Sequence, residues 1–303
     1  MLRRALRALP AVLLTAACTS GATPPPRAAP AECALKPGRH TLRHGGQERT
    51  YLLSLPAKGK GRWPVVLNLH GLGSNAGRQA DRSRLPAAGA RRGYVIVTPQ
   101  MARHRMAWTL PGYYGPDDTG FLTTLLDTLV AKGCADASRQ FAAGMSYGAG
   151  MSMALVCAMK GRLAAVAPVA GLNVVPPCPE AAPTTIVAFH GTGDVTVPYG
   201  GGHPFARSPS RLRTLAKLVR LASVEGAAGR WARIMGCPAP RTTKVRAGVR
   251  LRAWKDCRQG VSVRLYTIGG AGHVWPRPDG VRRVDAAGLI LDAFDAVSVR
   301  RGR

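Results

Sequence analysis

The stretch Gln140–Met159 reads QFAAGMSYGAGMSMALVCAM, and it decides the fold class of the chain. Its apolar start, Gln140–Ala143, is typical of a buried strand, and its apolar end, Ala149–Met159, is typical of a buried helix. Between them, Gly144–Gly148 (GMSYG) has the pattern G-x-S-x-G. A strand, a sharp turn and a helix are the context in which this pattern exposes a nucleophile, because the glycines remove side chains that would clash. We therefore predict that Ser146 is a nucleophile.

Short apolar runs lie on both sides of this stretch, separated by longer segments. Continuous runs of this kind are typical of a parallel sheet that helices cover on both faces. The fold class predicted is α/β, with a mostly parallel central sheet. The predicted strands are Arg49–Leu55, Val65–Leu69, Tyr94–Thr98, Gln140–Ala143, Ala164–Ala167, Ile186–Phe189 and Val263–Ile268, and the predicted helices are Phe121–Lys132, Tyr147–Met159 and Asp285–Val297. Two long segments are expected to be irregular and to form a lid or substrate rim, Gln100–Asp118 and Tyr199–Arg233.

A serine hydroxyl needs a base to take its proton and an acid to orient that base. Asp194 follows the predicted strand Ile186–Phe189, and His273 follows Val263–Ile268 in a glycine-rich loop. Both loops leave the carboxyl ends of strands, where open α/β sheets place their sites. The order Ser, Asp, His is also one of the known orders of a triad. We predict a catalytic triad of Ser146, Asp194 and His273.

Other titratable residues compete for these roles. Glu225 is the rival acid, but no predicted strand precedes it. His190 is expected to be structural and to hydrogen-bond the loop of the acid. His203, in a segment rich in glycine and proline, is expected at the surface or at a substrate rim.

An oxyanion hole needs two backbone N–H donors. One is expected from Tyr147, the residue after the nucleophile. The second is expected from the loop after Val65–Leu69, where Leu72 is the preferred donor and Gly71 the alternative. His70 is expected to brace this loop.

The first residues resemble an export signal. Residues 1–17 combine arginines, a short apolar run and small residues, which is typical of a signal peptide. The run Leu14–Cys18 (LTAAC) resembles a bacterial lipobox, with Cys18 as the lipidated residue and the outer face of the cell membrane as the location; cleavage and free secretion is the alternative. Residues 18–32 form a Pro/Ala-rich tether, and 33–303 the single folded domain.

The six remaining cysteines are an even number in an exported chain, which predicts disulfides, although six allow about 15 connectivities. We expect Cys237–Cys257, Cys157–Cys178 and, by elimination, Cys33–Cys134. No pair has CxxC spacing, so a zinc site is not favoured.

The chain has 303 residues and a formal net charge of +28, from 43 Lys and Arg against 15 Asp and Glu. A specific nucleic-acid binder is not favoured, because the chain lacks zinc-finger spacing, an RNP signature and a basic helix joined to heptads. The charge is explained either by arginine-rich composition and solubility or by attraction to anionic envelope polymers or a membrane surface.

Six ordered segments together resemble the polyhydroxybutyrate depolymerase / feruloyl esterase family of α/β-hydrolases. They are Gly46–Tyr51, Leu67–Gly71, Asp117–Phe121, Gly144–Gly148, His190–Asp194 and Gly272–Pro276. The resemblance implies hydrolysis of short hydroxyacid esters and polyesters, or of feruloyl and acetyl esters, without a metal or organic cofactor. The family often has Cys where this chain has Leu72, and Asn where it has Tyr147, but both positions keep their backbone N–H.

Two other functions remain open at this point. One is a different serine-triad enzyme, either a peptidase or an acyltransferase that passes the acyl group to an envelope sugar. The other is a non-catalytic basic protein that binds acidic polymers of the envelope. The presence of all three triad residue types favours an enzyme over this second alternative.

Overall fold

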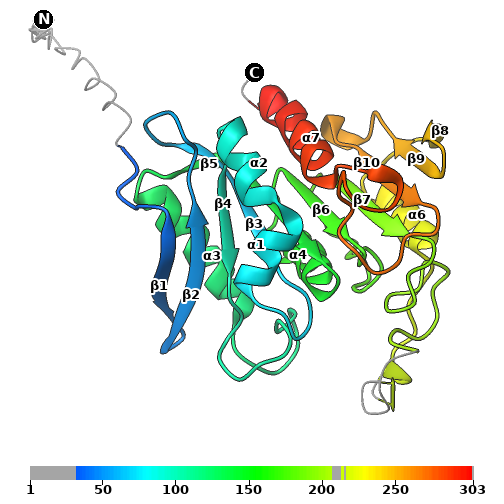
Figure 1. Ribbon diagram of the computed structural model, residues 1–303, viewed down its shortest axis with the longest axis horizontal. Helices are drawn as coiled ribbons and strands as arrows, with labels where there is room; N and C mark the ends of the chain where they lie inside the picture. Colours follow the sequence, from blue (N-terminus) through cyan, green and yellow to red (C-terminus); the bar gives the residue numbers. More distant parts are fainter. Residues whose placement is uncertain (1–31, 207–212, 215, 302–303) are drawn as a thin grey trace, which may run out of the picture.

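A ten-stranded sheet forms the centre of the computed structural model, which describes residues 32–206, 213–214 and 216–301 (Figure 1). The strand order across the sheet is β1-β2-β4-β3-β5-β6-β7-β10-β9-β8. The six strands from β4 to β10 in this order are parallel, and an antiparallel pair extends each end of the sheet. The bounds are β1 Gly38–His44, β2 Gln47–Ser54, β3 Trp63–Leu69, β4 Val95–Pro99, β5 Ala135–Met145, β6 Ala165–Val169, β7 Thr185–Gly191, β8 Arg241–Arg246, β9 Val249–Trp254 and β10 Val263–Ile268.

Helices cover both faces of the sheet (Figure 1). One face carries α1 (Ala76–Ser83), α2 (Leu85–Arg92) and α7 (Ala286–Arg301), and the other carries α3 (Asp118–Ala131), α4 (Tyr147–Ala158) and α6 (Val224–Ile234). Two short 3₁₀ turns are also present, Arg258–Gly260 and Val281–Arg283. Each face has its own apolar core, because strands buried on both sides present side chains to both helix layers.

The fold class predicted from the sequence is confirmed. All seven predicted strands and all three predicted helices are present, with boundaries that differ by a few residues. The largest boundary difference is in β5, which begins at Ala135 rather than Gln140 because the segment Asp136–Arg139, in which no residue is buried, continues the strand.

The segment Tyr199–Arg233 is not wholly irregular as predicted, since it contains most of α6. Ser223 caps this helix by accepting a hydrogen bond from the Gly226 amide, and Val224, Ala228 and Trp231 bury one face of it. The strands β8 and β9 were not predicted, because every residue of β8 is exposed and the strand has no apolar alternation.

The six described cysteines form Cys33–Cys134, Cys157–Cys178 and Cys237–Cys257, the three pairs expected from the sequence. The predicted signal peptide, Cys18 and most of the tether lie outside the described residues. In the part of the chain that is described, no helix is long and apolar enough to cross a membrane. The same part contains no group of three His, Cys, Asp or Glu side chains placed to hold a metal ion.

Candidate active site

Ser146 lies at the sharp turn between β5 and α4, with φ 58° and ψ −122°. A positive φ is rare for a residue with a side chain and marks a strained position. The turn is tight because backbone closes around it: a Cβ on Gly148 would overlap the carbonyl oxygens of Leu69 and His70, and one on Gly144 would overlap Gly148. Only glycine fits at both positions, which explains the G-x-S-x-G spacing.

Asp194 and His273 come together although 79 residues separate them. His273 Nδ1 lies 2.7 Å from Asp194 Oδ2, and the Asp194 side chain is fully buried while that of His273 is 20% exposed. Asp194 Oδ1 accepts hydrogen bonds from the amides of Thr196 and Val197 at 2.9 and 2.8 Å. These bonds fix the carboxylate against the imidazole and leave the other ring nitrogen, Nε2, to face away from it.

The environment of Asp194 keeps its carboxyl group ionised. Burial by itself raises the pKa of Asp194, but hydrogen bonds from His190 and His273, the charge of His273 and the Val197 amide outweigh burial and hold the pKa far below its usual value. An ionised acid beside Nδ1 stabilises an imidazolium, which is the charge that a general base acquires.

His190 is the buried residue that holds the acid loop in place. Its Nε2 lies 2.8 Å from the Val197 carbonyl oxygen and 3.3 Å from Asp194 Oδ2. Its Nδ1 is buried and has no hydrogen-bond partner among the described residues. This position fits the structural role expected from the sequence.

The loops that carry Asp194 and His273 and the turn that carries Ser146 leave the same edge of the sheet. Ser146 follows β5, Asp194 follows β7 and His273 follows β10, and all three strands are parallel. Within the described chain, Ser146 Oγ makes no hydrogen bond to His273. In enzymes without substrate such bonds are often long and tighten only in the complex.

The sequence predicts the backbone amides of Leu72 and Tyr147 as the donors of an oxyanion hole. In the described residues, neither the Leu72 nor the Tyr147 amide donates to a backbone carbonyl, whereas the Gly73 amide donates to the Met106 carbonyl oxygen at 2.7 Å. Leu72 and Tyr147 line the same pocket as Ser146. A Cβ on Gly71 would lie 3.7 Å from Ser146 Oγ, so the loop passes directly over the nucleophile. Tyr147 N–H is also the first donor of α4, where the positive end of the helix dipole lies.

His70 fixes the shape of this loop. The Met101 amide donates to its Nε2 at 3.4 Å, and its Nδ1 lies 3.0 Å from the Gly71 carbonyl oxygen. The Trp108 indole packs against the ring and donates to the His70 carbonyl oxygen at 2.8 Å. Burial lowers the pKa of His70, which favours the neutral ring that this pattern requires.

An apolar pocket of about 370 Å³ opens at Ser146. Part of its wall comes from the two segments that were expected to form a substrate rim, Gln100–Asp118 and the loop that precedes α6. Among the described residues, the lining contains no charged side chain; it consists of Leu72, Leu110, Tyr113, Ser146, Tyr147, Val174, Val197, Pro204, Phe205, Ala216, Val219 and Leu221. Of the aromatic residues that the sequence offers as pocket walls, Tyr113 and Tyr147 line it; the aliphatic wall residues were not identified, because they lie in segments without periodicity.

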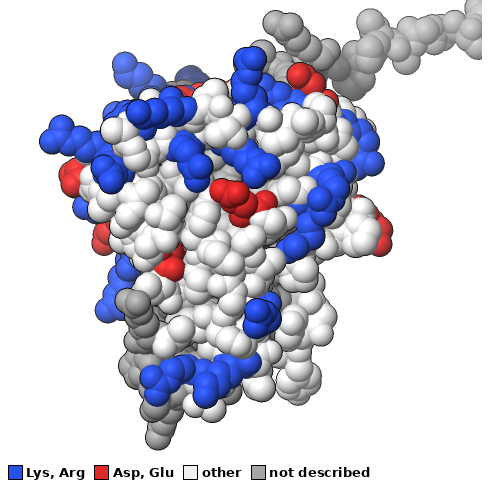
Figure 2. Space-filling model, turned by 90° about the vertical axis from the view of Figure 1, so that its right-hand side faces the viewer, with Lys and Arg blue, Asp and Glu red and all other residues white. Residues whose placement is uncertain are grey.

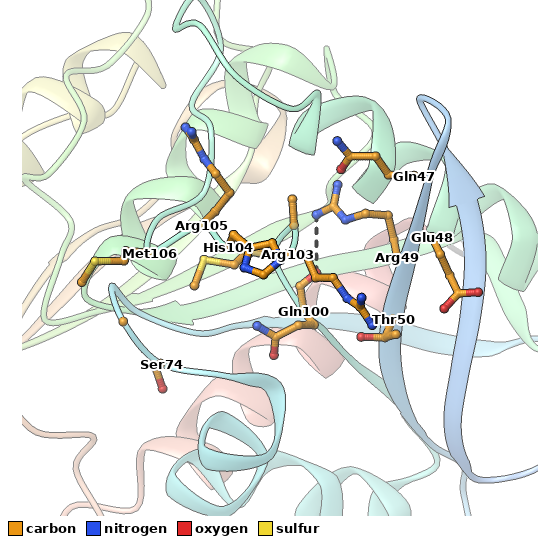
Figure 3. A pocket seen from close by; sticks show the side chains of 13 residues that line it. Gln47, Glu48, Arg49, Thr50, Ser74, Gln100, Arg103, His104, Arg105 and Met106 are labelled. Atoms are coloured by element: carbon orange, nitrogen blue, oxygen red, sulfur yellow. Dashed lines mark hydrogen bonds between the residues drawn. The ribbon is translucent and has the colours of Figure 1, made fainter.

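A larger hollow of about 980 Å³ lies on the other side of the oxyanion loop, between β2 and Gln100–Met106 (Figure 3). It is polar and basic, and Arg49, Gln100, Arg103 and His104 surround it (Figure 3). Arg49 is buried there, with Nη2 2.5 Å from Asp118 Oδ1 and 3.4 Å from the Gln100 carbonyl oxygen. Among the described residues, neither Thr50 nor Ser74 in its lining makes a hydrogen bond to a histidine, and Ser146 lies outside this larger hollow.

The remaining candidates lie away from the triad. Glu225 lies at the start of α6, where it accepts from the Tyr199 hydroxyl at 2.9 Å and pairs with Arg252 at 3.3 Å. Burial, and to a lesser extent the neighbouring carboxylate of Glu225, raises the pKa of Tyr199 to about 12. His203 is exposed and bonds the Val219 carbonyl oxygen at 2.9 Å, close to the rim of the apolar pocket.

Comparison with known proteins agrees with the resemblance that the motifs indicate. Residues 49–183 match the family described as Esterase PHB depolymerase. Feruloyl esterase B of Piromyces equi is 28% identical over 218 residues, which are 69% of this chain and 39% of that protein. The bifunctional acetylxylan esterase/xylanase XynS20E of Neocallimastix patriciarum is 23% identical over 216 residues, 69% of this chain and 28% of that protein. The chain thus spans less than half the length of these two curated relatives.

The fold also matches solved structures. The acetyl xylan esterase from Aspergillus awamori superposes with a TM-score of 0.62 at 13% sequence identity, over 85% of this chain and 99% of that chain. At this identity the likeness establishes the fold, which is the α/β-hydrolase fold predicted from the sequence. The resemblance to the esterase family is confirmed, and the relatives found by sequence are esterases.

Proposed function

We propose that this chain, whose residues 49–183 match the Esterase PHB depolymerase family, is an exported serine esterase that hydrolyses carboxylic esters through an acyl-enzyme. The observation that carries the proposal is the 2.7 Å contact between His273 and a buried, ionised Asp194, at the same sheet edge as a serine in a strained turn.

The reaction begins with proton transfer. Ser146 Oγ attacks the ester carbonyl carbon while His273 Nε2 accepts the hydroxyl proton, and Asp194 stabilises the imidazolium that results. The negative charge that develops on the carbonyl oxygen is stabilised by the amides of Leu72 and Tyr147. His273 then protonates the leaving alcohol, and water hydrolyses the acyl-enzyme by the reverse sequence of proton transfers.

The walls of the pocket support an apolar acyl group. A chain or ring without charge buries its surface against Leu110, Val219 and Leu221, whereas a charged acyl group would lose its hydration without gaining a partner. Acetyl, short hydroxyacyl and feruloyl groups all satisfy this requirement.

Export is supported by three disulfides, since such bonds persist in oxidising compartments. Lipidation at Cys18 remains part of the proposal and is testable by metabolic labelling with a fatty acid, which Cys18→Ser would abolish.

A panel of nitrophenyl esters tests the activity. The wild-type protein is expected to hydrolyse acetate and butyrate esters, and Ser146→Ala is expected to reduce kcat/KM by about 10⁴-fold or more at unchanged thermal stability. Peptide anilides serve as the control substrate, and turnover of these without turnover of esters would favour a peptidase. Undiminished ester turnover by Ser146→Ala would refute the proposed mechanism.

A further inference from the structure

The hairpin β8–β9 forms a strongly basic edge of the sheet, next to the proposed active site. Residues 241–255 contain six Lys and Arg and no Asp or Glu. Figure 2 views the molecule from this side and shows Lys and Arg spread over its upper part, with few acidic groups between them.

The cations line a groove rather than a flat surface. A hollow of about 490 Å³ lies between the hairpin and the loops after β7 and β10, and Lys244, Arg246 and Arg250 line it. The β8–β9 pairing is irregular between Lys244 and Arg246, so strand alternation does not decide on which face each side chain lies. Both residues nevertheless line the hollow, and Arg246 also donates to the Arg283 carbonyl oxygen at 2.9 Å. Thr192, which belongs to the loop of Asp194, and Gly269, which follows β10, form the opposite wall.

The pairing register brings like charges together. Lys244 lies directly opposite Arg250 on β9, and Arg250 lies directly opposite Thr267 on β10. Like charges directly opposite each other in antiparallel strands are destabilising. The Glu225 carboxylate lies 3.8 Å from the Arg250 guanidinium and balances its charge weakly. Among the described residues, no carboxylate lies within ion-pair distance of Lys244 or Arg246. An anion in the groove would relieve this repulsion.

The groove opens toward the edge of the sheet that carries the triad. Val249 pairs with Ile268 at the carboxyl end of β10, and the Gly269 amide donates to the Gly248 carbonyl oxygen at 2.7 Å. The turn of the hairpin therefore lies at the same edge as the loops of Asp194 and His273. A polymer bound in the groove can extend along this edge to Ser146.

We infer that this groove, lined by Lys244, Arg246 and Arg250, binds an acidic polysaccharide and presents its ester groups to the active site. The inference rests on the proposed function and adds the class of alcohol, a sugar polymer with repeated carboxylates or phosphates. A membrane surface fits less well, because the hairpin lacks the exposed Trp, Phe and Leu side chains with which such surfaces are bound. A single-stranded nucleic acid fits less well, because no aromatic ring lines the groove.

Binding is measured with the Ser146→Ala protein, so that catalysis does not enter the result. The probes are polygalacturonate for carboxylates, polyphosphate for phosphates, neutral xylan, and vesicles of anionic phospholipid. The test variant is Lys244→Glu/Arg246→Glu, with Lys244→Gln/Arg246→Gln as a milder form in case the first does not fold. The matched control is Arg39→Glu/Arg43→Glu, which makes the same charge change on β1, the edge strand at the other end of the sheet.

The test variant is expected to weaken binding to polygalacturonate or polyphosphate by about tenfold at low salt, and the control by less than about twofold, because the effect depends on local rather than net charge. Neutral xylan is expected not to bind. When the test substitutions are made in the protein that keeps Ser146, hydrolysis of acetylated polygalacturonate should fall relative to wild type, while hydrolysis of nitrophenyl acetate is unchanged.

Equal weakening by the test and control variants would overturn the inference, since net charge would then explain binding. Tighter binding to phospholipid vesicles than to either polymer would overturn the inference and identify a membrane surface as the ligand of the groove. Polymer binding by the Ser146→Ala protein together with absence of nitrophenyl ester turnover in the wild type would refute the proposed function and leave the groove as a binding site.

Discussion

Two hollows lie on opposite sides of the loop Gly71–Ser74, and they differ in size and in chemistry. The larger, about 980 Å³, has several charged and polar side chains in its lining, among them Arg49, which pairs with the buried Asp118. The smaller, about 370 Å³, is apolar and opens at Ser146. The comparison shows that volume alone does not locate the chemistry: of these two hollows, the smaller is the one lined by Ser146, the serine in the strained turn.

Of the substitutions that test the difference between the two hollows, Asp194→Asn is expected to have the largest effect on turnover. Asparagine keeps the shape but places an N–H where His273 Nδ1 needs an acceptor, so the imidazole adopts the wrong tautomer and kcat/KM should fall by about 10⁴-fold. Steady-state hydrolysis of nitrophenyl acetate measures the loss. A fall of less than about tenfold would mean that Asp194 is not the orienting acid.

The same variant tests the pKa of Asp194. Because the folded-state pKa is depressed, the carboxylate stabilises the native state above the unfolded pKa of about 3.9, and this contribution is lost as pH falls through the folded value. The stability gap between wild type and Asp194→Asn, measured by urea unfolding, should be full at pH 5 and shrink steadily below pH 4. A gap that is independent of pH would show that the pKa is not depressed.

The residues of the larger hollow are expected to affect stability. Arg49→Ala removes one partner of an ion pair in which both side chains are at most 2% exposed. Breaking such a pair leaves an uncompensated buried charge and should reduce the free energy of unfolding by about 3–5 kcal/mol. Arg49→Ala/Asp118→Ala is the control, because removal of both charges should cost less than the single change in urea unfolding, and equal costs would contradict the argument.

Val219→Asp tests the apolar wall at Ser146. Val219 is 47% exposed, so a carboxylate there is tolerated by the fold, but it replaces an apolar contact of the acyl group. The KM for a butyrate ester should rise about tenfold and that for an acetate ester less, while kcat changes little. Val219→Ala separates loss of contact from added charge. An unchanged KM for butyrate would place the acyl group elsewhere.

The smallest effect is expected from Arg103→Ala. Arg103 is an exposed residue at the wall of the larger hollow, and among the described residues it has no ion pair. Its removal should change kcat/KM for nitrophenyl esters by less than about twofold and stability by less than about 0.5 kcal/mol. A tenfold loss of turnover would show that the larger hollow takes part in catalysis.

The sequence predicted the central sheet and the order of its functional loops because those features have local signals. Ser146, Asp194 and His273 each follow an apolar run, and glycines mark the turns. The basic hairpin was missed because Arg241–Arg246 has no buried side chain and thus no alternation. Wall residues such as Phe205 and Leu221 were missed because they owe their positions to tertiary contacts of irregular segments.

Covalent labelling of the active serine tests the central claim most directly. A fluorophosphonate reacts with a serine whose hydroxyl is activated by a neighbouring base, and peptide mapping by mass spectrometry identifies the residue modified. The account predicts one adduct at Ser146, formed in the wild type, strongly slowed in His273→Ala and absent in Ser146→Ala. Ester turnover in a protein that is labelled at another residue, or not labelled, would contradict it.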